Sequence, residues 1–80
     1  MTIIDVLLPQ SGMGMQDGEI IQWLKSVGDE VSEGEVIVEV EAAKVTIEVN
    51  APVAGTLVEI LAEGGEVKDV REGIAKIRVW

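Results

Sequence analysis

The fold is decided by the stretch Val36-Ile-Val-Glu-Val-Glu-Ala-Ala-Lys44-Val-Thr-Ile-Glu-Val49. In its two halves, β-branched apolar residues recur at every second position, which is typical of strands with one buried face. The bridge, Ala42-Ala43-Lys44, contains no Gly, Asn or Pro. We therefore expect a hairpin closed by a type I turn, which tolerates most residues, rather than by a primed turn that requires positive φ. Such a tip holds the amine of Lys44 out in water.

Further strands are expected on both sides of this hairpin. Short apolar runs are separated by turn signals such as Gly28-Asp29 and Gly64-Gly65. Residues 19–27 have an apolar spacing that a helix could share, but the segment is short, β-branched and bounded by glycine. Together with the hairpin strands at 36–41 and 45–49, we expect strands at 3–8, 19–25, 56–61, 67–70 and 74–79.

The composition excludes several classes of function. The chain has 80 residues, no cysteine and no histidine, and its net charge is −9. It therefore lacks disulfides, thiolate metal sites and the commonest general base. Acid on this scale opposes binding to nucleic acid or to an anionic membrane, and no apolar run approaches the ~18 residues of a membrane span. The acid either keeps a small protein soluble or steers it toward basic partners.

An internal repeat organises the whole chain, which we expect to be one domain spanning residues 1–80. Gly18-x-Ile20-x-x-Trp23-Leu24 aligns with Gly55-x-Leu57-x-x-Ile60-Leu61, and Glu33-Gly34 aligns with Glu72-Gly73, at offsets that drift from 37 to 39 residues. Two copies of one strand unit predict an all-β fold of two small sheets with pseudo-twofold symmetry, packed as a sandwich or flattened barrel. The Lys44 hairpin lies at the junction of the copies, so the terminal strands should meet at the opposite end.

These features together resemble a lipoyl domain of the biotinyl/lipoyl-carrier family over essentially all 80 residues. The N-terminal half, above all Gly18 to Gly34, resembles acyltransferase components of 2-oxoacid and acetoin dehydrogenase complexes more than it resembles carboxyl carriers. The resemblance is carried by Pro9, Gly12 to Met15, Gly18 to Leu24, Gly28 to Gly34, Val38 to Lys44 and Ala51 to Gly55.

The resemblance implies roles for individual residues. Lys44 would carry lipoate as an amide. The attaching enzyme would recognise Gly28, Glu41, Ala43, Val45 and Gly55. The loop containing Met13, Gly14 and Met15 would contact the cognate dehydrogenase. Each role has a plainer alternative: Gly28 and Gly55 serve turn backbone, Glu41 is a solvated strand residue, and the methionines fill loop and core.

The resemblance also implies a function and partners. The domain would be a non-catalytic carrier that shuttles acyl groups and electrons between active sites, and monomeric when isolated. Its partners would be a lipoate-attaching enzyme, a thiamine-diphosphate dehydrogenase, an acyltransferase core and a dihydrolipoyl dehydrogenase. Its place would be the cytoplasm of a bacterium or archaeon, or the mitochondrial matrix if it comes from a longer chain. Tethering raises the effective concentration of such a carrier at each active site.

The tip sequence leaves two alternatives open. Lipoyl domains usually read Asp-Lys-Ala at this point and biotinyl domains Met-Lys-Met, whereas this chain reads Ala43-Lys44-Val45. The first alternative is a biotin carboxyl carrier domain of a carboxylase, with biotin on Lys44. The second is an unmodified β-sandwich binding module, in which Lys44 is a solubilising charge or a guard against edge pairing.

Overall fold

Strands make up nearly all of the regular structure. The computed structural model describes residues 2–10 and 15–80, and these contain eight strands and no helix. The strands are β1 (Ile3–Leu7), β2 (Asp17–Trp23), β3 (Glu30–Val31), β4 (Val36–Ala42), β5 (Val45–Asn50), β6 (Gly55–Ile60), β7 (Val67–Asp69) and β8 (Gly73–Val79). The predicted all-β class is confirmed, and the segment 19–27 is a strand followed by a turn, not a helix.

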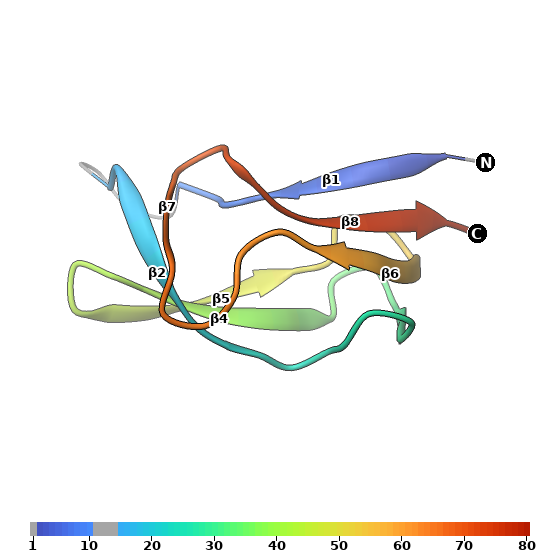
Figure 1. Ribbon diagram of the computed structural model, residues 1–80, viewed down its shortest axis with the longest axis horizontal. Coiled ribbons are helices and arrows are strands. Elements are labelled where there is room, and N and C mark those ends of the chain that lie inside the picture. Colours follow the sequence, from blue (N-terminus) through green and yellow to red (C-terminus); the bar gives the residue numbers. More distant parts are fainter. Residues whose placement is uncertain (1, 11–14) are drawn as a thin grey trace.

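The strands form two antiparallel four-stranded sheets, ordered β1-β8-β6-β3 and β5-β4-β2-β7 (Figure 1). β3 was not expected from the sequence. It has two residues, Glu30 and Val31, paired with Thr56 and Gly55, and two residues are too few to show a period. The remaining strands begin and end within two residues of the predicted limits.

A pseudo-twofold relation connects the two sheets, as the repeat predicts. Exchanging β1, β8, β6 and β3 for β5, β4, β2 and β7 reproduces both strand orders. The irregularities correspond as well, because β2 and β4 shift register between Ile20 and Gln22, and β6 and β8 do so between Leu57 and Glu59. The two halves therefore share pairing detail as well as topology.

The turns correct the alignment of the two copies. The carboxylate of Glu35 accepts a hydrogen bond from Ser32 N at 2.9 Å, and that of Glu72 accepts one from Asp69 N at 2.9 Å, so both pairs differ by 37 positions. The left-handed residues of these turns also correspond at 37, because Gly34 has φ 86° and Arg71 has φ 71°.

The predicted match of Glu33-Gly34 with Glu72-Gly73 was therefore wrong by two residues. The sequence alignment followed the glycine, whereas in the second copy Arg71 occupies the left-handed position where glycine is usual. With the offset held at 37, the strands β4 and β8 also show the same order of burial over their first six residues. The apparent drift in the repeat disappears.

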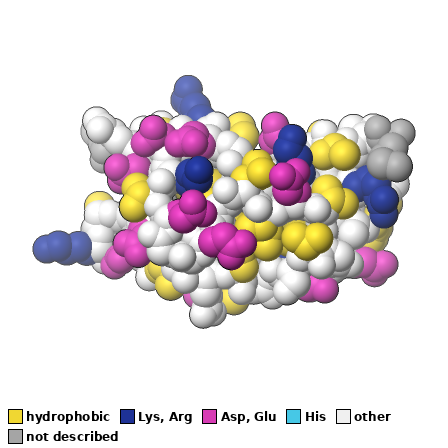
Figure 2. Space-filling view, viewed as in Figure 1, with side chains coloured by type: hydrophobic (Ala, Val, Ile, Leu, Met, Phe, Trp, Pro, Cys, Tyr) yellow, Lys and Arg dark blue, Asp and Glu magenta, His cyan; other side chains and the backbone are white. Residues whose placement is uncertain are grey.

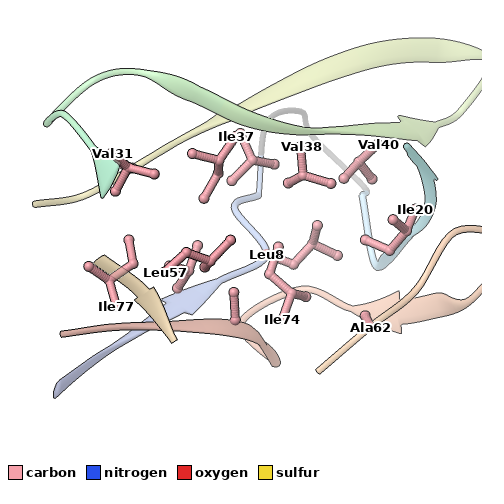
Figure 3. Packing of buried hydrophobic residues seen from close by; sticks show 14 of the residues in the cluster. Leu8, Ile20, Val31, Ile37, Val38, Val40, Leu57, Ala62, Ile74 and Ile77 are labelled. Atoms are coloured by element: carbon pink, nitrogen blue, oxygen red, sulfur yellow. The ribbon is translucent and has the colours of Figure 1, made fainter. Parts of the chain in front are cut away.

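The core lies between the sheets and contains no buried polar side chain among the described residues. Side chains from β2 and β4 point toward those from β6 and β8 across the interior (Figure 3). The fully buried larger ones are Val6, Leu8, Ile20, Val31, Ile37, Val38, Val40, Leu57, Ile74 and Ile77. Each buried aliphatic side chain stabilises the fold by roughly 1.5–3 kcal/mol relative to an exposed one, so this layer holds both sheets in place.

The terminal strands meet at the end of the molecule opposite the β4–β5 hairpin, as expected (Figure 1). β1 pairs with β8, and Val79 N donates a hydrogen bond to Thr2 O at 2.9 Å. The longest dimension is 35 Å, and the hairpin tip lies at the other end of it (Figure 1). A chain attached at either terminus would leave the hairpin tip unobstructed.

Candidate functional site

The hairpin tip is the tightest reversal in the described part of the chain. Ala42 and Val45 are directly opposite each other in the β4–β5 ladder, so two residues close the turn. Ala43 has φ 52° and Lys44 has φ 66°. Positive φ at both central residues is the mark of a type I′ turn, so the expected type I turn was wrong. The type I′ twist matches the twist of the flanking strands, and that demand outweighs the roughly 1–2 kcal/mol per residue that left-handed backbone costs.

Lys44 projects from this turn into solvent. Its side chain is exposed, and it makes no hydrogen bond or ion pair with residues 2–10 or 15–80. Its neighbours Ala43 and Val45 are exposed too, with 60% of Val45 accessible. An amine in this position can be approached from several directions by an enzyme, and the backbone beneath it is fixed by the ladder.

The hairpin also brings Glu41 to the same end. Glu41 is exposed, and its Cα partners are Glu19 on β2 and Thr46 on β5. Of the residues that the sequence assigned to recognition by an attaching enzyme, Glu41, Ala43 and Val45 thus share the hairpin with Lys44.

Gly28 and Gly55 do not share that end. Gly55 pairs with Val79, next to the C-terminus, and Gly28 N donates to Leu57 O at 2.7 Å. Both glycines therefore contact the pair of strands β6 and β8, whose last residue is next to the C-terminus. The structure does not bring these two glycines together with Lys44. An enzyme surface that binds the hairpin tip would therefore not contact them merely because of the fold.

The backbone explains both glycines without an enzyme. A Cβ on Gly55 would lie 2.2 Å from Arg78 O, so a side chain there would collide with the next strand. Gly28 has φ 98°, and a Cβ added to it would have no atom within 4 Å, so its requirement is conformational. The plainer of the two expectations for Gly28 and Gly55 accounts for what the structure shows.

The loop assigned to a dehydrogenase partner is described only in part. Met13 and Gly14 lie outside the described residues. Met15 has 9% of its surface accessible and belongs to the core cluster, so its side chain fills the core as the alternative expectation held. The strand that follows leads to Gly18, where an added Cβ would lie 3.6 Å from Glu41 O on the hairpin. The strand β2, which follows Met15, thus lies against the hairpin strand β4.

Carboxylates cover the outer face of the hairpin's sheet. Three like-charged pairs lie directly opposite each other across neighbouring strands: Glu19–Glu41, Glu39–Glu48 and Asp17–Asp69. In the space-filling view, acidic side chains lie scattered among apolar and basic ones over the visible face of the molecule (Figure 2). Like charges directly opposite destabilise a sheet, so this arrangement opposes stability. The sequence revealed the overall acid, but the pairing needed the register.

Other surface features are separate from Lys44. A groove of about 590 Å³ opens between the ends of β1 and β5, where Leu7, Pro9, Asn50, Pro52 and Arg71 contribute to its lining. The described residues contain no group of acidic side chains arranged to hold a metal ion. No helix long and apolar enough to cross a membrane occurs in residues 2–10 and 15–80.

The chain is similar to known proteins over nearly its whole length. The biotin/lipoyl family model described as "Biotin-requiring enzyme" matches residues 4–77. The dihydrolipoyllysine-residue acetyltransferase component of the pyruvate dehydrogenase complex of Corynebacterium glutamicum is 48% identical over 73 residues, which cover 91% of this chain and 11% of that protein. The dihydrolipoyllysine-residue succinyltransferase component of the 2-oxoglutarate dehydrogenase complex of Staphylococcus saprophyticus is 42% identical over 73 residues, 91% of this chain and 17% of that protein.

Two solved structures share the fold. The lipoyl domain of the 2-oxoglutarate dehydrogenase complex from Azotobacter vinelandii superimposes with a TM-score of 0.75 at 32% identity, covering 94% of this chain and 95% of that one. The urea carboxylase of Kluyveromyces lactis gives a TM-score of 0.83 at 22% identity, covering 98% of this chain and 6% of that one. At that identity the carboxylase shows a common fold alone.

Fold and tip together define a class: two-sheet domains that present a single lysine on a tight hairpin. The chain belongs to the biotin/lipoyl family, and within it to the lipoyl domains. It spans 11% and 17% of the lengths of the two acyltransferase components described above.

Proposed function

We propose that Lys44 carries lipoate as an amide on Nζ, and that the domain shuttles acyl groups and electrons between the active sites of a 2-oxoacid dehydrogenase complex. The observation that carries the proposal is the exposed Lys44 amine at the tip of a two-residue type I′ hairpin. When attached, lipoate supplies a dithiolane that accepts an acyl group and two electrons. The protein itself positions the lysine that carries lipoate and keeps it accessible to other enzymes.

The residues at the tip fit such an attachment. Attachment requires the neutral amine to attack an activated carboxyl group, with loss of the leaving group and of one proton from nitrogen. Lys44 is exposed and unpaired within the described part of the chain, and the preceding residue, Ala43, is small. The ladder between Ala42 and Val45 holds the turn in one conformation. An attaching enzyme therefore meets a preorganised target.

Lipoate is favoured over biotin by the kind of relative that matches. The two acyltransferase components are named for a dihydrolipoyllysine residue and are 48% and 42% identical to this chain. The carboxylase shares only the fold, at 22% identity. One relative is an acetyltransferase component and the other a succinyltransferase component, so the proposal extends to 2-oxoacids as a class.

We assign recognition by the attaching enzyme to Glu41, Ala43 and Val45, because the hairpin brings them beside Lys44. The further partners we propose are a thiamine-diphosphate dehydrogenase, an acyltransferase core and a dihydrolipoyl dehydrogenase, with the chemistry performed by these enzymes and not by the carrier. The acidic outer face around Glu41 would meet basic surfaces at their active-site entrances.

The test is the intact mass of the protein expressed with lipoate- and biotin-attaching enzymes both present. The expected result is a lipoyl increment on the wild type that is absent from Lys44→Arg, which keeps the charge and lacks the reactive primary amine. A biotinyl increment would transfer the chain to the carboxylase branch. An unmodified wild type, with both enzymes shown to modify a reference domain, would favour the unmodified binding module.

A further inference from the structure

A carrier that is acylated on one amine must keep its other amines from reacting. The chain has four lysines: Lys25, Lys44, Lys68 and Lys76. Under the proposed function, the domain repeatedly visits sites that hold activated acyl groups. Any exposed neutral amine could be acylated there in place of the dithiolane on Lys44, so the low reactivity of the other three lysines matters to the carrier.

Lys25 is held by the most complete set of contacts of the four. Its Nζ lies 3.0 Å from Glu35 Oε2 and donates a hydrogen bond to Glu30 O at 3.4 Å. Its side chain is 27% accessible, and that of Glu35 is 34% accessible. The hydrogen bond from Lys25 to Glu35 raises the pKa of the lysine, with the charges of Glu35 and Asp29 acting in the same direction. Both effects keep the amine protonated and occupied.

Glu35 is held by the backbone as well as by the lysine. Its other carboxylate oxygen accepts a hydrogen bond from Ser32 N at 2.9 Å. The pseudo-twofold equivalent, Glu72, accepts the same bond from Asp69 N at 2.9 Å. At an offset of 37, the equivalent of Lys25 is Ala62, so the second copy has the anchored carboxylate without a lysine. The backbone therefore anchors a carboxylate at this turn in both copies, and only the first copy has a lysine against it.

We propose that Glu35 is a specificity-determining residue of this carrier: it withholds the amine of Lys25 from acylation, so that Lys44, with its lipoyl amide, remains the acylated lysine. The proposal rests on the proposed function of Lys44 as the acylated residue. Glu35 acts through Lys25 and contacts no substrate.

The remaining lysines are protected to a lesser degree. Lys76 lies 3.5 Å from Asp5 Oδ1, and its side chain is 39% accessible. Lys68 is partly buried on β7, with Gly18 as its Cα partner. Among residues 2–10 and 15–80, neither lysine has a second contact like the hydrogen bond from Lys25 to Glu30 O. We therefore expect the order of reactivity to begin with Lys44 and to end with Lys25.

The test uses an activated ester, sulfo-N-hydroxysuccinimide acetate, on the unmodified domain at limiting concentration. The lysine nitrogen attacks the ester carbonyl, the C–N bond forms, the ester C–O bond breaks, and N-hydroxysulfosuccinimide and one proton leave. Digestion with a glutamate-specific protease and mass spectrometry then give the acetylated fraction of each lysine. We expect Glu35→Gln to raise acetylation of Lys25 by about threefold, because exposed ion pairs have modest strength. Lys44 should not change.

Glu72→Gln is the matched control, because it alters the same backbone contact in the other copy, where no lysine is present. It should leave Lys25 unchanged. Equal acetylation of Lys25 in the wild type and Glu35→Gln would overturn the proposal, as would a rise at all four lysines, which would indicate loosening of the fold. The lipoylation assay is independent of this result: failure at Lys44 with a rise at Lys25 would remove the proposed function and leave the masking intact.

Discussion

Ala42 and Val45 lie directly opposite each other, and the whole reversal between them is made by two residues with left-handed backbone, Ala43 at φ 52° and Lys44 at φ 66°. Neither is glycine or asparagine, the residues that adopt this conformation most easily. The chain thus accepts a conformational cost at the one point where it presents its exposed amine. That cost is a feature that mutation can measure.

Replacing Ala43 by asparagine should stabilise the domain. Asparagine tolerates left-handed backbone, so Ala43→Asn should raise the free energy of unfolding by about 0.5–1 kcal/mol. Urea unfolding followed by Trp fluorescence measures this directly. The matched control is Ala54→Asn, because Ala54 does not have positive φ. A gain at position 54 equal to that at position 43, or a loss at position 43, would contradict the type I′ geometry.

Gly55→Ala should be far more damaging than Gly28→Ala. The added methyl group at position 55 would lie 2.2 Å from Arg78 O and 2.8 Å from Ile77 Cγ2, so the two strands would have to separate. We expect a loss of about 3 kcal/mol, the upper end for overpacking. Gly28 has open space and φ 98°, so its substitution should cost about 1–2 kcal/mol through backbone strain alone.

The same two variants test whether these glycines act in recognition. Both glycines lie away from the hairpin tip, where lipoate would be attached. The rate of lipoylation per folded molecule should therefore equal that of the wild type. The measurement is the initial rate at several temperatures, corrected for the folded fraction from circular dichroism. A residual rate defect in fully folded Gly28→Ala would restore a recognition role that the fold does not provide.

Glu19 and Glu41 form a like-charged pair across β2 and β4, and relieving it should separate stability from recognition. Either Glu19→Gln or Glu41→Gln should raise the free energy of unfolding by about a few tenths of a kcal/mol, with a smaller gain at high salt. Only Glu41→Gln should slow lipoylation, because Glu41 shares the hairpin with Lys44. Equal lipoylation rates in both variants would leave Glu41 as a solvated strand residue.

Most of the fold could be predicted because strands and turns leave patterns that can be read from short stretches of sequence. Alternation of apolar residues in the hairpin, and the repeat that aligns Gly18 with Gly55, are enough to specify strands, sheets and symmetry. β3 was missed because two residues carry no period. The repeat register failed at Arg71, where a left-handed residue is not a glycine.

The residues of the candidate site could be proposed from the sequence, but their spatial arrangement could not. Lys44, Ala43 and Val45 are adjacent, so any hairpin brings them together. The type I′ turn was missed because strand twist, a property of the whole ladder, overrides the local preference of an alanine and a lysine. The separation of Gly28 and Gly55 from the tip depends on which sheet each strand joins, and no local pattern encodes that.

The ion pair between Lys25 and Glu35 should make a pH-dependent contribution to stability with two limits. The hydrogen bond from Ser32 N, followed by that from Lys25, lowers the pKa of Glu35 below 4.5, and the hydrogen bond to Glu35 raises the pKa of Lys25 above 10.5. Because folding lowers the pKa of Glu35, its carboxylate stabilises the fold at pH values above the pKa of the unfolded chain. This contribution is lost as the pH falls through the pKa of the folded state. Because folding raises the pKa of Lys25, its ammonium group stabilises the fold at pH values below the pKa of the unfolded chain. This contribution is lost as the pH rises through the pKa of the folded state.

The pair should therefore stabilise the fold between about pH 4.5 and 10.5, and its contribution should disappear in stronger acid or base. A double-mutant cycle of Lys25→Gln and Glu35→Gln in urea measures the coupling at about pH 2.5, 7 and 11.5. We expect a small favourable coupling at neutral pH that weakens with salt and is lost as acid protonates Glu35. Coupling that persisted in acid would mean that the two side chains interact by packing and not by charge, and Glu35 could then not withhold the amine of Lys25 by holding it protonated.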